Sequence, residues 1–251
     1  MKTILNISYG KEPEQNLEVY LPDIDAFPVF VYLHGGSLQS GSAGEVSMVY
    51  EYMASQGIAV VAGNYRKYPG AKYPDFVEDA AAIVAWTIDN MSAHGNVQGV
   101  YVGGSSAGGY LSMMLCFDQR WLGKYGIDAS QISGYVHDAG QPTCHFKVLR
   151  ERGVDMRRVI VDDSAPLYHI GEAEEYPPML IVVSDNDMTN RYEQTMLVMS
   201  TLKHFEYDMS KVQLKVMHGG HCDYVKRLDK DGKSELGSIV CDYIKEIMRL
   251  S

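Results

Sequence analysis

A serine flanked by glycines is the first feature of the sequence that could carry chemistry. It lies in the segment GGSSAGG (residues 103–109), between an apolar run at 100–102 and a helical pattern that ends near 117. A serine on so tight a strand-to-helix turn needs small neighbours, because a Cβ two positions away would collide with the opposite limb of the turn. Gly104 and Gly108 meet this need around Ser106, whereas a turn centred on Ser105 would require glycine at position 107 and finds Ala107. The spacing predicts Ser106 as a nucleophile; the alternative is a glycine-rich turn with incidental serines.

Two later turns hold the residue types that a serine nucleophile requires, a base and a carboxylate that orients the base. The segment SDND (184–187) follows an apolar run at 178–183, and the segment HGGH (218–221) follows another at 212–217. A strand-to-helix turn that presents a serine in this way is called a nucleophile elbow. Proteins that have one carry the serine, the acid and the histidine in this order along the chain. Each turn offers two residues for its role.

Position favours one residue in each turn. Asp187 is favoured as the acid over Asp185, and Asp138, at the end of an earlier strand, ranks third; an aspartate near a helix start often serves only as a cap. His221 is favoured as the base over His218, because the Gly-Gly pair before His221 lets the chain swing back toward the serine. A base must be neutral to accept a proton, so activity should fall below a pH of about 6 to 7.

A glycine-rich loop, HGGS at 34–37, follows the apolar run at 28–33. Consecutive glycines at the carboxyl end of a strand let several backbone N–H groups point the same way, as stabilisation of a developing oxyanion requires. His34, His137 and His145 fit loop or pocket positions better than the role of base.

Composition and charge narrow the class of protein. The 251 residues are 46% apolar, with no internal repeat or linker, which predicts a single domain over 1–251. The formal charge of −10 disfavours nucleic-acid and anionic-membrane surfaces and suits a soluble monomer or a small oligomer such as a homodimer, acting on a neutral small molecule. The apolar patch behind Lys2 is too short for a secretory segment and no run approaches a membrane span, so a cytoplasmic location is expected.

Apolar runs and helical patterns alternate along the chain and predict an α/β fold. The first two strands should form an antiparallel hairpin at a sheet edge, and the rest imply a mostly parallel central sheet flanked by helices. Right-handed crossovers then bring the loops described above to the carboxyl edge of the sheet. We expect strands at 3–8, 17–21, 28–33, 58–63, 99–103, 132–137, 179–183 and 212–217, and helices at 44–55, 75–91, 106–117, 189–204 and 234–250.

The connection 139–176 is too long for a plain loop between a strand and the next. It contains two prolines and a run of charged residues with little periodicity. We expect a partly helical cap-like insertion over the active site; a surface excursion unrelated to substrate is the alternative.

Four segments together carry a family resemblance: HGG at 34–36, NYR at 64–66, YPDF at 73–76 and GSSAGG at 104–109. They resemble the α/β-hydrolase esterases of the hormone-sensitive-lipase, feruloyl-esterase and kynurenine-formamidase-like groups, and the similarity runs over nearly the whole chain. The resemblance implies an α/β-hydrolase fold and a carboxylic ester hydrolase with no metal or organic cofactor. It also implies Ser106 as nucleophile, His221 as base, Asp187 as orienting acid, and an oxyanion hole from the backbone of Gly36, Ser37 and Ala107.

The sequence departs from the lipase-like group at two positions of these motifs. Ser37 stands where that group has a third glycine, and Ser105 stands where it has an aspartate before the nucleophile. Both changes keep the backbone donors. Only 33 residues precede His34, which suggests a more open pocket than in that group. Arg66 is expected to pair with an acid such as Asp79 and to join strand to helix.

The sequence leaves the substrate open. An open site suits short acyl groups or aryl acids, such as acetyl or feruloyl esters of plant-polysaccharide sugars, and equally other small esters. An amide or peptide hydrolase of the formamidase or dipeptidyl-peptidase type is the alternative among enzymes, and a non-catalytic binding protein is a more distant one. We expect the substrate pocket to be lined by His34, Leu38, Ser105, His145, Phe146 and Tyr168.

Overall fold

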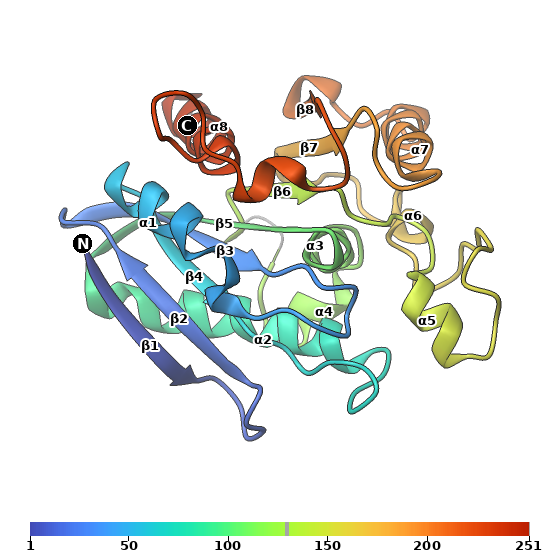
Figure 1. The fold of residues 1–251 in the computed structure, drawn as a ribbon, viewed down its shortest axis with the longest axis horizontal. Coiled ribbons are helices and arrows are strands. Elements are labelled where there is room, and N and C mark those ends of the chain that lie inside the picture. Colours follow the sequence, from blue (N-terminus) through green and yellow to red (C-terminus); the bar gives the residue numbers. More distant parts are fainter. Residues whose placement is uncertain (129–130, 251) are drawn as a thin grey trace.

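The centre of the molecule is an eight-stranded sheet with the order β1-β2-β4-β3-β5-β6-β7-β8, seen in the computed structural model, which describes residues 1–128 and 131–250 (Figure 1). The pairs β1–β2 and β2–β4 are antiparallel, and all later pairs are parallel. The predicted edge hairpin and the mostly parallel sheet are confirmed. The strands are β1 Lys2–Ser8, β2 Asn16–Leu21, β3 Ala26–Leu33, β4 Ala59–Gly63, β5 Asn96–Ser105, β6 Gly134–Asp138, β7 Met179–Ser184 and β8 Val212–Met217.

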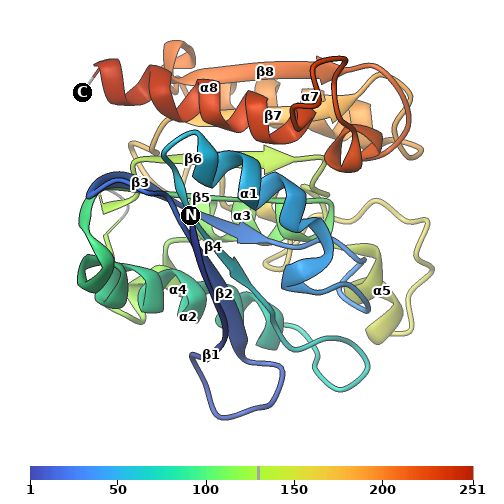
Figure 2. The same cartoon turned by 60° about the vertical axis from the view of Figure 1, so that its left-hand side comes forward.

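Helices cover both faces of the sheet (Figures 1 and 2). Residues of α1 and α8 share one apolar cluster with the sheet, whereas residues of α2, α3 and α7 share the other. The α-helices are α1 Ser47–Ser55, α2 Asp75–Asn90, α3 Ala107–Phe117, α4 Arg120–Gly123, α5 Phe146–Glu151, α6 Pro166–His169, α7 Arg191–His204 and α8 Glu235–Leu250. Short 3₁₀ turns lie at Ala43–Val46, Met91–His94, Met209–Lys211 and Asp223–Lys226.

The run that predicted β3 is apolar on both sides because both faces of this strand are covered. Val29 and Val31 face the cluster that contains α2 and α3, and Phe30 and Tyr32 face the one that contains α1 and α8. Successive strand residues point to opposite faces, so a strand covered by helices on both sides reads as a continuous apolar run. This burial fixes the position of the loop that follows β3.

The structure extends or trims several predicted elements. The strand expected at 99–103 runs over Asn96–Ser105, because β5 pairs with β3 from Asn96 onward although its first half is polar and partly exposed. The helix expected at 44–55 is a 3₁₀ turn followed by α1. The pairing of Arg66 with Asp79 is confirmed, with Nη2 to Oδ1 at 2.7 Å and both carboxylate oxygens engaged by Nε. It joins the segment after β4 to α2.

The connection 139–176 contains the short helices α5 and α6 and lies beside α3 and α7 (Figure 1). The Tyr110 hydroxyl of α3 donates to the carbonyl of Ser164 at 2.8 Å, and the Tyr73 hydroxyl donates to the carbonyl of Asp163 at 3.0 Å. These bonds hold the insertion at the carboxyl edge of the sheet. Within the described residues, no helix combines the length and the apolar character needed to cross a membrane.

Candidate active site

The turn between β5 and α3 holds Ser106 in a strained backbone conformation, with φ 56° and ψ −110°. Its N–H donates to the carbonyl of Asp138 at 2.8 Å, which ties the turn to β6. A Cβ on Gly104 would lie 2.3 Å from the carbonyl oxygen of Leu33, and one on Gly108 would lie 1.8 Å from it. The two glycines around Ser106 are therefore required by the close approach of β3, and a strained residue held by its surroundings is typical of a nucleophile elbow.

A chain of two hydrogen bonds leads from Ser106 to an acid. His221 Nε2 lies 2.8 Å from Ser106 Oγ, and His221 Nδ1 lies 2.6 Å from Asp187 Oδ1. The residues come from three loops at one edge of the sheet, after β5, β8 and β7. The turn before His221 contains Gly219 with φ 125°, a conformation that favours glycine, and it returns the chain toward the serine. This arrangement can move a proton from the serine to the imidazole.

The carboxylate of Asp187 is fully buried and held from several sides. Besides His221, the N–H of Met188 donates to Oδ1 at 2.7 Å and the N–H of Ser184 donates to Oδ2 at 3.3 Å. Burial by itself would raise the pKa of Asp187, but the hydrogen bond and charge of His221 and these two N–H groups outweigh it and hold the pKa below its ordinary value. The carboxylate of Asp187 is therefore ionised at neutral pH.

A second pair of the same kind lies on the same two turns. His218 Nδ1 is 2.7 Å from Asp185 Oδ2, and the N–H of Gly219 donates to Asp185 Oδ1 at 3.0 Å. This pair is open to solvent, with the His218 side chain 96% exposed against 22% for His221. The contacts of Asp185 and His218 are with each other and the turn backbone rather than with Ser106.

Backbone donors are available beside the serine. Among residues 1–128 and 131–250, the N–H groups of Gly36 and Ser37 have no hydrogen-bond partner. Gly36 has φ 116° and Ser37 has φ 58°, so the loop after β3 is turned away from regular pairing. Ala107 begins α3, where the first N–H groups lack acceptors within the helix. The three N–H groups that were predicted from the sequence to form an oxyanion hole are thus free to bind an oxyanion.

A buried polar network lies beneath the elbow. Ser105 Oγ donates to Asp138 Oδ2, the Tyr224 hydroxyl donates to Asp138 Oδ1, and the Tyr32 hydroxyl donates to Ser105 Oγ at 2.8 Å. Burial raises the pKa of Asp138 to about 6, against the hydrogen bonds that favour its ionised form. Asp138, the third-ranked acid, thus contacts hydroxyls rather than a histidine, and it supports the turn that carries Ser106.

A cavity of about 520 Å³ opens at Ser106 and His221. Tyr32, Glu45 and Lys226 line it, although no sequence pattern singled them out: Tyr32 belongs to a core strand, and the other two lie in polar turns. Only the fold brings these segments to the serine. The cavity is lined by Tyr32, His34, Gly35, Gly36, Ser37, Glu45, Val46, Ser105, Ser106, His221, Cys222, Asp223, Val225 and Lys226.

Of the residues predicted for the pocket, His34 and Ser105 line this cavity and the others lie elsewhere. Leu38 is fully buried in the core, because the loop after β3 turns it inward. His145 is buried and accepts from the N–H of Lys147 at the start of α5, and Tyr168 is 55% exposed on α6. Phe146 lines a different cavity. Residues of 139–176 line that other cavity, and the residues that line the cavity at Ser106 come from other segments.

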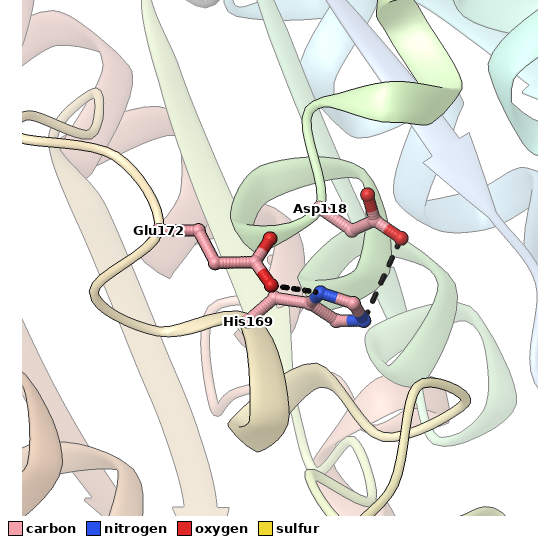
Figure 3. Close-up of side chains that lie close together, drawn as sticks. All are labelled: Asp118, His169 and Glu172. Carbon is pink, nitrogen blue, oxygen red and sulfur yellow. Dashed lines mark ion pairs between the residues drawn. The ribbon is translucent and has the colours of Figure 1, made fainter.

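Asp118, His169 and Glu172 form a cluster whose side-chain atoms could approach a metal ion (Figure 3). The two carboxylates face opposite edges of the imidazole, with Asp118 Oδ2 3.5 Å from Nε2 and Glu172 Oε1 3.1 Å from Nδ1. Asp118 is also bound by Arg120 through Nε at 2.8 Å and Nη2 at 2.7 Å. Because the guanidinium already neutralises the buried carboxylate, we interpret the cluster as a structural network of polar contacts that ties α6 to the end of α3.

The parallel sheet, the strained serine turn and the histidine loop after β8 together define an α/β-hydrolase fold. A family model described as alpha/beta hydrolase fold matches residues 30–221, and the chain belongs to this family. Two solved structures have the same fold. Esterase B of Lactobacillus rhamnosis has a TM-score of 0.80 at 18% identity, over 99% of this chain and 86% of that one. A truncated carbohydrate esterase from gut microbiota has a TM-score of 0.79 at 16% identity, over 99% and 97%.

Curated relatives match parts of the chain. A probable isoprenylcysteine alpha-carbonyl methylesterase of Arabidopsis thaliana is 32% identical over 54% of this chain and 34% of its own length. A probable carboxylic ester hydrolase of Mycobacterium tuberculosis, LipM, is 26% identical over 72% and 47%. Kynurenine formamidase of Salmo salar is 31% identical over 45% and 38%. The chain spans less than half the length of each of these relatives.

Proposed function

We propose that this chain is a serine carboxylesterase that hydrolyses esters of short acyl or aryl acids through an acyl-enzyme. The observation that carries the proposal is the continuous contact from Ser106 Oγ through His221 to the buried Asp187, with unpartnered N–H groups beside the serine. Ester hydrolases among the relatives support the same reaction class.

In the proposed mechanism Ser106 Oγ attacks the ester carbonyl while His221 Nε2 takes its proton. Asp187 holds the imidazole through Nδ1 and stabilises its positive charge. The negative charge on the carbonyl oxygen is stabilised by the N–H groups of Gly36, Ser37 and Ala107. His221 then gives the proton to the leaving alcohol, and a water activated by the same imidazole hydrolyses the acyl-enzyme and regenerates Ser106.

A panel of chromogenic esters tests the proposal. We expect turnover of p-nitrophenyl esters from acetate to octanoate, highest at the short end, with methyl ferulate and acetylated xylo-oligosaccharide showing whether acetyl or feruloyl esters of plant-polysaccharide sugars are preferred. If the folded protein hydrolyses none of these esters, the proposal is refuted.

Amide hydrolysis is the second candidate, because kynurenine formamidase is among the relatives. The same nucleophile, base and oxyanion donors serve ester and amide cleavage. The ratio of kcat/KM for an ester to that for the amide or formamide of the same acyl group decides between them. A ratio below one would replace the esterase proposal with amide hydrolysis.

A further inference from the structure

A second cavity, of about 450 Å³, is lined by the segment after β6 and by the segment that leads from β7 into α7. Its size falls within the range of small-molecule sites. None of the described residues that line it is acidic, although the protein carries a formal charge of −10. The lining residues are Gln141, Phe146, Met156, Arg157, Arg158, Val159, Met188, Thr189, Asn190, Arg191 and Gln194.

Arg191 is a buried cation that forms no close ion pair within residues 1–128 and 131–250. It is only 5% exposed, and Nη1 donates to the carbonyl of Ala139. Among these described residues its other side-chain N–H groups make no hydrogen bond, and they are not sealed from solvent. Burial lowers the pKa of the guanidinium, and the nearby charge of Asp187 opposes part of this effect. A buried charge is costly unless it is paired, so an anion in this cavity would offset the part of the cost that Asp187 leaves.

A bond to the elbow region places Arg191 near the reacting groups. Ala139, whose carbonyl it binds, follows Asp138, whose own carbonyl holds the N–H of Ser106. His221 lines the other cavity together with the residues that follow it. Because His221 must protonate the leaving alcohol, the alcohol belongs to the cavity at His221. An acyl chain that leaves Ser106 past Ala139 would extend toward Arg191.

Four apolar side chains form part of the cavity wall, beside polar side chains that include Gln141 and Gln194. Phe146, Met156, Val159 and Met188 contribute to its walls, and the last three are large apolar side chains that are exposed to solvent. Arg157 is paired with Asp155 at 2.6 Å, and Arg158 is exposed, so Arg191 is the buried cation of the three arginines at the cavity. A guanidinium matches the planar geometry of a carboxylate. The site thus fits an aliphatic chain that ends in a carboxylate.

We propose that Arg191 binds a carboxylate at the far end of the acyl group, so that the preferred substrates are half-esters of dicarboxylic acids. The proposal rests on the proposed esterase function for the bond that is cleaved, but the binding of the anion can be measured without cleavage. It replaces the sequence-based expectation of a neutral substrate.

Chain-matched esters test this preference. The substrates are the mono-p-nitrophenyl esters of glutaric, adipic and suberic acid and the p-nitrophenyl esters of pentanoic, hexanoic and octanoic acid. We expect Arg191→Met to lower the anionic-to-neutral ratio of kcat/KM by about 10- to 100-fold, the size of a lost hydrogen bond to a charged group, mainly through KM. Arg191→Lys should recover part of the ratio. Arg249→Gln, which removes an exposed charge on α8, is the matched control and should leave the ratio unchanged.

Three kinetic results would overturn the proposal. One is a wild-type ratio no higher than one for every chain length. The second is an equal loss on anionic and neutral esters in Arg191→Met, which would make Arg191 a positioning residue for Asp187. The third is a preference for a carboxylate on the alcohol instead, measured with 4-carboxyphenyl hexanoate.

Calorimetric binding to Ser106→Ala separates this proposal from the esterase function. Monomethyl adipate should bind at least about 10-fold more tightly than dimethyl adipate, and the difference should vanish in Ser106→Ala/Arg191→Met. If the wild type cleaves no ester but this difference is found, the esterase function fails and the anion site stands. Equal binding of the two probes would refute the anion site even in an active esterase.

Discussion

Two Asp–His pairs lie on the same two turns and have nearly the same length, yet their surroundings differ. The Asp187–His221 pair, at 2.6 Å, has a fully buried carboxylate and reaches Ser106. The Asp185–His218 pair, at 2.7 Å, joins a 96% exposed histidine to a carboxylate that is 44% exposed. A short Asp–His contact therefore does not define a catalytic pair. Burial of the acid and a contact with the Ser106 hydroxyl distinguish one pair from the other.

The difference has a local cause in the turn between the two histidines. Gly219 adopts φ 125° and Cys222 adopts φ 58°, which reverses the chain so that His221 points back to the sheet edge. Ser184 Oγ donates to the carbonyl of Gly220 at 2.7 Å and fixes this turn against the acidic one. His218 lies before the reversal and remains in solvent.

The largest expected effect separates the two histidines. We expect His221→Ala to lower kcat by about 10⁴- to 10⁶-fold, because the base that accepts the serine proton is lost. His218→Ala is the matched control, since it removes the same side chain from the neighbouring pair, and should retain activity within about threefold. Steady-state rates on p-nitrophenyl acetate measure both. Comparable losses in the two variants would break the distinction between the pairs.

The two acids should differ in the same way but less strongly. Asp187→Asn keeps the shape of the side chain while removing the charge that holds the imidazole tautomer, so kcat should fall by about 10³- to 10⁴-fold. Asp185→Asn should leave kcat nearly unchanged. Small, equal losses would exclude both aspartates as the orienting acid.

A third carboxylate, that of Asp138, should make the free energy of unfolding depend on pH. The pKa of Asp138 is about 6 in the folded protein, against about 3.9 when unfolded, so between these values the folded state binds more protons. Its contribution to stability therefore increases as the pH falls from 7 to 4. Relative to Asp138→Asn, the wild type should gain about 2–3 kcal/mol of unfolding free energy over this range. Urea titrations at pH 7 and 4 measure the difference, and a relative loss in the wild type at pH 4 would contradict the raised pKa.

The smallest expected effect concerns the stability of the exposed pair. His218→Ala and Asp185→Asn should leave the melting temperature unchanged within error, alone or combined, because exposed ion pairs contribute little and are screened by salt. A clear drop for either variant that disappears at 1 M salt would show that the exposed pair stabilises the two turns.

Much of the sheet and of the serine turn could be predicted from the sequence, because short stretches of sequence determine them. The glycines on either side of Ser106 fixed the register of the elbow, and the approach of Leu33 now explains why they are needed. The buried parallel strands could be located from continuous apolar runs, as at β3. The start of β5 was missed because pairing with β3, rather than apolar character, makes Asn96 part of the strand.

The lining of the site could not be predicted because it depends on contacts between distant segments. The sequence predicts Tyr32 as a residue of a core strand, yet its hydroxyl donates a hydrogen bond to Ser105, 73 residues away along the chain. In the sequence, Arg191 is only a residue of the predicted helix 189–204, and the contact with Ala139 shows that it is a buried cation. Tyr168 was predicted to line the substrate pocket. It lies exposed on α6 instead, because the insertion packs against α3 through other residues.

The central claim is that Ser106 is a nucleophile activated by His221, and covalent labelling tests it most directly. We expect a fluorophosphonate probe to add one label to the wild type, mapped by mass spectrometry of the peptide that contains Ser106, and to label His218→Ala at a similar rate. Labelling should be absent in Ser106→Ala and at least about 100-fold slower in His221→Ala. A folded wild-type protein that remains unlabelled, or a label that persists in Ser106→Ala, would contradict the account.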